Sequence, residues 1–138
     1  MRAMLLAFLI SFWMTATDPS VLTVQTVYAA EIQWTVEDVK SLALEQVKLY
    51  NLPRNRFMYT LECENGFRAT GQSQHINNKG EREQSFGAVQ INLPSHPGIT
   101  QEMSEDPYFA VPWMAEQFAM WNASMWSCYT NKYGAGSG

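Results

Sequence analysis

Residues 61–67 read Leu-Glu-Cys-Glu-Asn-Gly-Phe, and they place one carboxylate, Glu64, at the end of a helical pattern. Phe57, Leu61 and Glu64 are spaced so that they share one face of a helix. Gly66 is the residue type that commonly follows a helix end, because it adopts left-handed backbone angles without strain. The segment therefore predicts an acidic side chain beside large apolar groups where a helix ends.

Glu64 has the expected surroundings of a general acid for cleavage of a sugar polymer. Such cleavage needs a proton on the leaving oxygen, and an ordinary glutamate is ionised at neutral pH. Burial against apolar groups disfavours the charged carboxylate and raises its pKa, and the negative end of a helix acts in the same direction. The alternative is a solvent-facing glutamate at a helix end, which is a common arrangement.

Two helices are predicted up to this segment. Thr35 and Asp38 are spaced as a capping box, and the apolar stripe that follows ends before Pro53. A second helix is expected from Asn55, which is a good N-cap residue, to Asn65.

Beyond the second helix the chain becomes polar and rich in turn residues. Residues 68–85 predict a long loop with a small, irregular β-hairpin at about residues 78–80. Residues 86–93 are apolar but too short for periodicity to distinguish helix from strand. Asp106-Pro107 begins another helix, which Pro112 is expected to kink or break. The whole pattern predicts an α+β domain that is mainly α.

The composition predicts one small folded domain and excludes some partners. The chain has 138 residues, 46% of them hydrophobic, which suits a single domain and argues against disorder. The net charge is −4 and no Lys/Arg cluster is present, which argues against nucleic acid and a polybasic membrane contact. His75 and His96 have no metal-ligand spacing with the cysteines, so no metal or other cofactor is expected.

The N-terminal segment has the pattern of a secretory signal peptide. Arg2 precedes an uncharged apolar run at residues 3–13, and Val27 and Ala29 occupy positions −3 and −1 of a predicted cut after Ala29. The alternative is an uncleaved N-terminal anchor, although the run is short for a bilayer.

Cleavage after Ala29 would divide the chain into three parts. Residues 1–29 would be the signal peptide, residues 30–133 the folded domain, and the Gly-rich residues 134–138 a flexible tail. We therefore expect a secreted, periplasmic or cell-envelope protein, monomeric and without stable membrane insertion once the signal is removed.

Cys63 and Cys128 remain as the two cysteines of the exported domain. An even count in an exported chain permits one bridge, and the alternative is two buried thiols. A bridge would hold the C-terminal region beside Glu64 and, in the chain-entropy account, stabilise the fold by about 4 kcal/mol.

Two motifs resemble those of a known family. Residues 64–67, Glu-Asn-Gly-Phe, are similar to the Glu-Ser-Gly-Phe motif of the lysozyme-like lytic transglycosylases of the soluble-transglycosylase type. Residues 87–91, Gly-Ala-Val-Gln-Ile, resemble their Gly-Leu-Met-Gln-Ile motif. A small exported variant of that family also has a cysteine before the catalytic glutamate and a C-terminal Trp-x-Cys-Tyr, as at residues 126–129. The resemblance covers about residues 51–129.

The resemblance implies a lysozyme-like fold with a cleft and a catalytic domain at residues 30–133. It implies Glu64 as general acid and then general base, acting on the β-1,4 bond between N-acetylmuramic acid and N-acetylglucosamine in peptidoglycan. The muramyl 6-hydroxyl would attack internally and leave a 1,6-anhydro product. Gln90 would bind sugar, and the alternative is a half-buried amide whose hydrogen bonds are satisfied. Ser85 would orient Glu64, and the alternative is a helix cap. Trp126 and Tyr129 are further cleft candidates, although such aromatics are more often core.

The departures from the family pattern leave a second class of function open. Asn65 stands where serine is usual, Pro112 stands where asparagine is common, and residues 121–124 replace the Ala-Tyr-Asn-Ala-Gly segment of many members. A catalytically inactive peptidoglycan-binding module would accommodate these changes.

A second carboxylate would favour a hydrolytic lysozyme over a transglycosylase. Glu81 and Glu83 lie in the predicted hairpin region, and glycosidases use a pair of carboxyl groups whose separation decides their mechanism. The alternative is that both are solvated charges beside Lys79 or Arg82, which contribute little as surface pairs.

Overall fold

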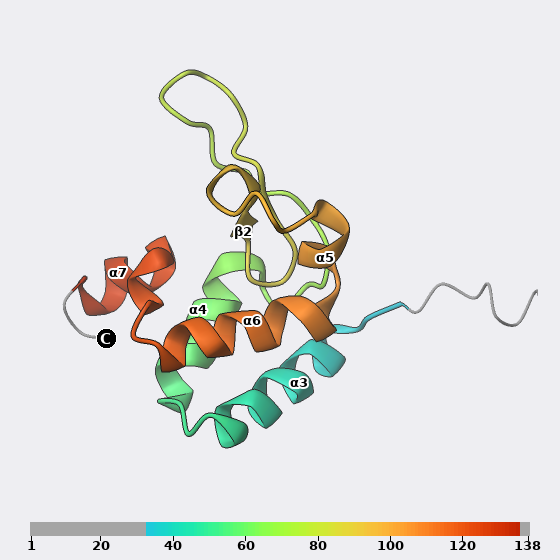
Figure 1. Cartoon of the computed structure of the whole chain (residues 1–138), viewed down its shortest axis with the longest axis vertical. Helices are drawn as coiled ribbons and strands as arrows, with labels where there is room; N and C mark the ends of the chain where they lie inside the picture. Colours follow the sequence, from blue (N-terminus) through green and yellow to red (C-terminus); the bar gives the residue numbers. More distant parts are fainter. Residues whose placement is uncertain (1–32, 136–138) are drawn as a thin grey trace, which may run out of the picture. The chain divides into compact units, whose positions relative to one another are not determined.

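The computed structural model describes residues 33–135, so the predicted signal peptide and the last residues of the predicted tail lie outside the described range. The described residues form five α-helices, two short 3-10 turns and one two-stranded antiparallel sheet (Figure 1). The predicted class, α+β and mainly α, is confirmed. None of the helices in this range is long and apolar enough to cross a bilayer. The elements are, in order, α3 (Val36–Leu49), α4 (Arg54–Asn65), β1 (Ser85–Phe86), β2 (Ile91–Asn92), η1 (Leu93–Ser95), α5 (Gln101–Glu105), α6 (Pro107–Ala119), η2 (Ala123–Met125) and α7 (Ser127–Tyr133).

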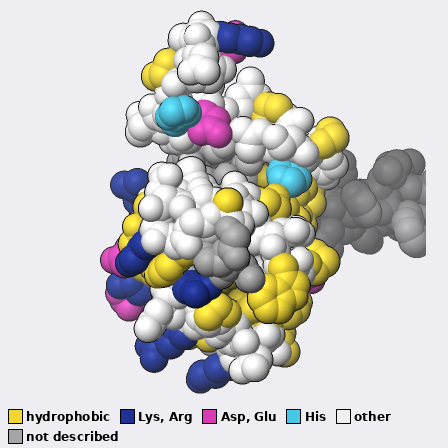
Figure 2. Space-filling model, turned by 90° about the vertical axis from the view of Figure 1, so that its left-hand side faces the viewer, with side chains coloured by type: hydrophobic (Ala, Val, Ile, Leu, Met, Phe, Trp, Pro, Cys, Tyr) yellow, Lys and Arg dark blue, Asp and Glu magenta, His cyan; other side chains and the backbone are white. Residues whose placement is uncertain are grey.

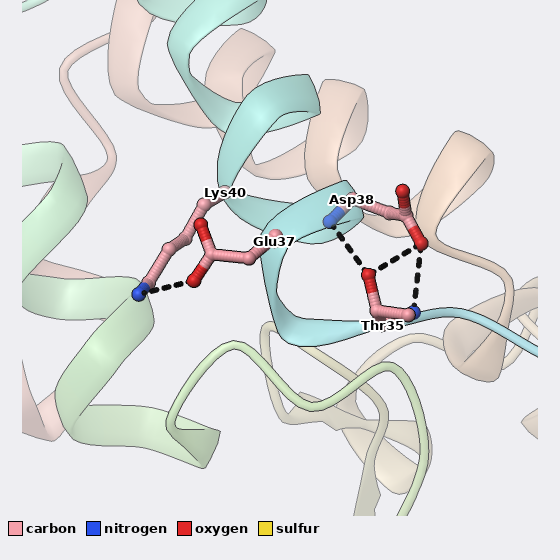
Figure 3. Close-up of polar contacts among 4 residues, drawn as sticks. All are labelled: Thr35, Glu37, Asp38 and Lys40. Carbon is pink, nitrogen blue, oxygen red and sulfur yellow. Dashed lines mark hydrogen bonds and ion pairs between the residues drawn. The ribbon is translucent and has the colours of Figure 1, made fainter.

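Helix α3 begins with the predicted capping box (Figure 3). Thr35 Oγ1 accepts from the Asp38 N–H at 3.1 Å, and the Asp38 carboxylate accepts from the Thr35 N–H at 2.9 Å. The Thr35 hydroxyl, which donates to the Asp38 carboxylate at 2.6 Å, and the Thr35 N–H both lower the pKa of Asp38, because they favour its charged form. The exposed Lys40–Glu37 pair at 3.1 Å adds little to stability.

Helix α4 starts earlier than predicted. Pro53 occupies the N-cap position without a side-chain bond, and its carbonyl accepts from the N–H groups of Arg56 and Phe57. The assignment of Asn55 as the cap was therefore wrong, because the chain is already helical at Arg54. The predicted end is confirmed, since Gly66 follows the helix with φ +58 in the left-handed region.

The hydrophobic core lies where α3, α4 and α6 meet. Val39, Phe57, Leu61 and Met114 are fully buried, and the rings of Phe57 and Phe118 meet edge to face with their centroids 5.0 Å apart. Each such side chain stabilises the fold by roughly 1.5–3 kcal/mol relative to exposure. The core therefore fixes α4, which bears Glu64 in its last turn.

Helix α6 begins at the predicted Asp106-Pro107 start, where the Asp106 side chain accepts from the Tyr108 N–H at 3.0 Å. Of the two effects expected of Pro112, a kink or a break, the break is absent, because one helix runs from Pro107 to Ala119. A proline removes one helical donor, here the partner of the Tyr108 carbonyl. Tyr108 is an exposed residue in the first turn of α6.

The polar segment forms an irregular hairpin, as predicted. Two isolated bridges, Gln72↔Phe86 and Ile76↔Arg82, take the place of regular strands. At the tip, Asn77 Oδ1 accepts from the N–H groups of Lys79 and Glu81 at 2.9 and 3.0 Å. In Figure 1 this hairpin projects away from the helices.

Residues 86–93, which periodicity left open, contribute to a second, tighter hairpin. Phe86 pairs with Ile91 across a turn at residues 87–90, and Gly87 has φ +82. A Cβ atom on Gly87 would lie 1.6 Å from the Ser104 carbonyl oxygen, which is a backbone atom of α5. Only glycine fits this contact between the turn and α5.

Candidate active site

A cavity of about 330 Å³ opens beside the end of α4. Five of the predicted site residues line it, whereas Glu81 and Tyr129 do not. Figure 2 shows histidine and acidic side chains close together on one hollowed face of the molecule. The lining residues are Glu64, Ser73, His75, Glu83, Ser85, Gln90, Ile91, Asn92, His96, Trp113, Met125, Trp126 and Ser127.

Glu64 lies in the last turn of α4 and is partly buried. Its pKa is raised above the ordinary glutamate value, chiefly because burial disfavours the charged carboxylate. The Cys128 N–H, which donates to Glu64 Oε1 at 3.2 Å, acts in the opposite direction. The negative charge of Glu83 raises the pKa further. The carboxyl is therefore biased toward the protonated form that a general acid requires.

The predicted bridge between Cys63 and Cys128 is present. It joins α4 to α7 beside Glu64, because Cys63 precedes Glu64 and the Cys128 amide is the hydrogen-bond donor to it. The covalent link thus fixes the position of that donor.

Trp126 is both a cavity-lining residue and a core residue, which are the two roles that the sequence left open. It lines the cavity but is only 5% exposed, and its indole N–H donates to the Val89 carbonyl at 2.8 Å. Its ring meets that of Trp113, a second lining residue, with centroids 5.9 Å apart. One cavity wall is therefore an extension of the core.

Tyr129, by contrast, is not brought to this cavity. It is 2% exposed, its hydroxyl accepts from Arg56 Nη1 at 3.1 Å, and its ring meets that of Phe118. It lines a separate cavity of about 350 Å³. The side chain faces this second cavity although its neighbour Cys128 contacts Glu64.

Gln90 has one satisfied and one unsatisfied end. Its amide nitrogen donates to the carbonyls of Gly71 and Gly87 at 3.1 and 2.8 Å. Its Oε1 atom is buried and has no hydrogen-bond partner within residues 33–135. A buried acceptor without a partner costs free energy.

Asn65, the departure from the family motif, connects the two motif segments. Its side-chain amide is buried and donates to the carbonyls of Thr70 and Gly87 at 3.0 Å each. Gly87 also accepts from Gln90. The end of α4 and the turn that bears Gln90 are thus held together by one carbonyl.

The structure distinguishes between the two candidate second carboxylates. Glu83 lines the cavity and accepts from Asn92 Nδ2 at 3.2 Å and Ser73 Oγ at 3.4 Å. Glu81 is exposed near the hairpin tip and accepts from Asn77 Nδ2. Glu83 alone shares the cavity with Glu64.

Ser85 lines the cavity and is 3% exposed. Its hydroxyl accepts from Asn92 Nδ2 at 3.3 Å. The structure thus pairs Ser85 with Asn92 and not with Glu64, so the predicted orienting contact is absent. Through Asn92, Ser85 and Glu83 are parts of one hydrogen-bonded group.

Several lining residues were missed by sequence reasoning. His96 and Trp113 meet edge to face at 5.1 Å, and their contact joins a loop to α6. Asn92 and Ser73, which hold Glu83, were also missed. Only Asn92 had a signal, because it directly follows the motif at residues 87–91.

Taken together, the cavity offers acid–base chemistry to a ligand rich in hydroxyl and amide groups. Within residues 33–135, no group of three or more His, Cys, Asp or Glu is placed to hold a metal ion. Comparisons of the chain with protein-family models, with curated proteins and with solved structures gave no match.

Proposed function

We propose that this chain is a lytic transglycosylase with a lysozyme-like fold, which cleaves the β-1,4 bond between N-acetylmuramic acid and N-acetylglucosamine in peptidoglycan. The observation that carries the proposal is Glu64, a partly buried carboxyl in a cavity, whose pKa is raised by burial. The choice of substrate and product rests on the motifs at residues 64–67 and 87–91.

Glu64 would serve both halves of the reaction. Protonated Glu64 donates its proton to the glycosidic oxygen as the bond from that oxygen to muramyl C1 breaks. The resulting carboxylate then takes the proton of the muramyl 6-hydroxyl as its oxygen bonds to C1. Glu64 ends protonated, no water is consumed, and the product has a 1,6-anhydro ring. The Cys128 N–H stabilises the carboxylate between the two steps.

Gln90 and the tryptophan wall would position the sugar. The Gln90 side chain lines the cavity, and a rotation that exposes its unsatisfied Oε1 would offer an acceptor to the N–H of an N-acetyl group. Trp113 and Trp126 offer apolar surface beside it, against which the C–H face of a pyranose ring packs.

A hydrolytic lysozyme is the second candidate, and the position of Glu83 favours it. Glu83 shares the cavity with Glu64 and its charge acts on Glu64. A second carboxylate can assist an attacking water or stabilise positive charge at C1. The product would then be a free reducing sugar.

Export to the cell envelope is part of the proposal. The pattern at residues 1–29 supports a signal peptide. The Cys63–Cys128 bridge supports an oxidising compartment, because such bridges persist there and are rare in the cytosol.

The test is mass spectrometry of the soluble products released from purified peptidoglycan. Anhydromuropeptides from the wild type, and none from Glu64→Gln, would support the transglycosylase. Reducing muropeptides would support the hydrolase. Binding without release by the folded, disulfide-intact protein would contradict both and leave a wall-binding module.

A further inference from the structure

Trp121 is a large aromatic side chain that the proposed cleft does not use. It is 75% exposed and follows α6 with φ +66. Left-handed backbone angles are rare for bulky side chains, and such outliers gather at ligand sites. Its neighbour Met120 is also 55% exposed, so the apolar surface continues beyond the indole.

The second cavity of about 350 Å³ lies beside this side chain. Tyr50, Trp121 and Tyr129 contribute aromatic surface to it, and Asn51 and Arg56 contribute polar groups. It shares no lining residue with the cavity that contains Glu64. The volume is within the range of small-ligand sites.

The chemistry of this second cavity differs from that of the first. Among the described residues that line it, none is Asp or Glu. The Tyr50 hydroxyl donates to Glu116 at 3.2 Å and keeps its lone pairs as acceptors. Exposed Asn51 adds an amide with both donors and acceptors. Arg56 adds a guanidinium that donates to the Tyr129 hydroxyl. An exposed indole beside polar groups suits a ring that has one apolar face and many hydroxyl or amide groups.

We propose that this cavity is a second, non-catalytic glycan site, in which a neutral N-acetylated pyranose ring packs on Trp121. The choice of a glycan rests on the proposed function, whereas the position of the site does not. Binding at two separate cavities would hold the protein on a polymeric substrate while Glu64 acts on a bond elsewhere along it.

The test is a titration of the ¹⁵N-labelled full chain, carrying Glu64→Gln, with the β-1,4-linked tetramer of N-acetylglucosamine. The indole N–H signals separate the two sites, because Trp126 and Trp113 line the first cavity and Trp121 lines the second. Trp121→Gly assigns the signal and removes the indole, and glycine is the residue best suited to φ +66. Tyr108→Ala is the matched control, since Tyr108 is 67% exposed but lines neither cavity.

The proposal expects a saturable shift of the Trp121 signal. Retention on insoluble peptidoglycan should fall about tenfold in Trp121→Gly, as for the loss of one aromatic contact, and stay unchanged in Tyr108→Ala. A Trp121 signal that does not move, whether or not Trp126 responds, would overturn it, as would equal losses in both variants. Product release is measured separately, so an inactive protein with a responding Trp121 would contradict the proposed function and not this site.

Discussion

The two walls of the Glu64 cavity are held in place by different forces. On the helical side, Glu64, Trp113 and Trp126 are attached to the packed core and to the disulfide. On the loop side, Glu83 is held by side-chain hydrogen bonds from Ser73 and Asn92. The helical wall supplies the apolar surroundings that raise the pKa of Glu64, and the loop wall supplies polar groups and charge.

Because the two walls are held by different forces, mutations in one wall should have different effects from mutations in the other. Changes in the helical wall should alter both chemistry and stability, because core packing and the proton donor are connected there. Changes in the loop wall should mainly adjust the electrostatics of the site, since exposed polar loops contribute less to global stability. The predictions below test this division, from the largest expected effect to the smallest.

Glu64→Gln should lower the rate of product release by roughly 10²–10⁴-fold, because it removes the general acid. The amount of soluble muropeptide released per minute measures the loss. Glu62→Gln is the control, since Glu62 is exposed on the same helix and does not line the cavity. Similar losses in both variants would show that Glu64 has no special role.

Gly87→Ala should destabilise the fold by on the order of 4 kcal/mol or more, a size associated with severe steric conflict. The added Cβ would lie 1.6 Å from the Ser104 carbonyl oxygen. Gly80→Ala has a similar positive φ but no atom within 4 Å of the added Cβ, so strain alone should cost about 1–2 kcal/mol. Urea unfolding of both variants separates crowding from strain, and equal losses would contradict the contact with α5.

Removal of both cysteines, as Cys63→Ser with Cys128→Ser, should lower the free energy of unfolding by about 4 kcal/mol. The bridge spans 65 residues of sequence, and its loss raises the conformational entropy of the unfolded chain. Activity should fall as well, because the Cys128 N–H is no longer fixed beside Glu64. Thermal unfolding measures the first effect. Added reductant should weaken the wild type and leave the double variant unchanged.

The raised pKa of Glu64 should make the wild type lose stability as pH rises. The folded protein holds this proton more tightly than the unfolded chain does, so stability falls from the ordinary glutamate value of 4.5 up through the folded pKa. Glu64→Gln lacks this dependence. The melting temperature of the variant should therefore exceed that of the wild type at pH 7, with the difference vanishing below about pH 4. A constant difference across this range would contradict the burial of the carboxyl.

Glu83→Gln should have the smallest effect if the chain is a transglycosylase. Without the charge of Glu83 the pKa of Glu64 falls, so the decline of activity at high pH should begin at a lower pH. The pH profile of product release measures this displacement, with Glu81→Gln as the exposed control. A near-complete loss of activity in Glu83→Gln would instead favour the hydrolase.

Local signals allowed the sequence to predict the helix ends around the site. The Thr35 capping box, Gly66 and the Asp106-Pro107 start all depend on residues within one turn of each other, and each is present. The Cys63–Cys128 bridge was also predictable, because two cysteines in a chain with an export pattern permit one pairing.

Long-range geometry explains what the sequence did not predict. Strand alternation would place Glu81, Glu83 and Ser85 on one side, but the turn at Asn77 draws Glu81 away from the cavity. The contact of His96 with Trp113 joins segments whose approach no local pattern encodes.

The disulfide also determines when the surroundings of Glu64 are complete. Helix α7 has seven residues, which is too short to persist on its own. Until the thiols are oxidised, no covalent link holds it against α4, and the hydrogen bond to Glu64 depends on that packing. Oxidation of Cys63 and Cys128 would therefore complete the surroundings of the Glu64 carboxyl.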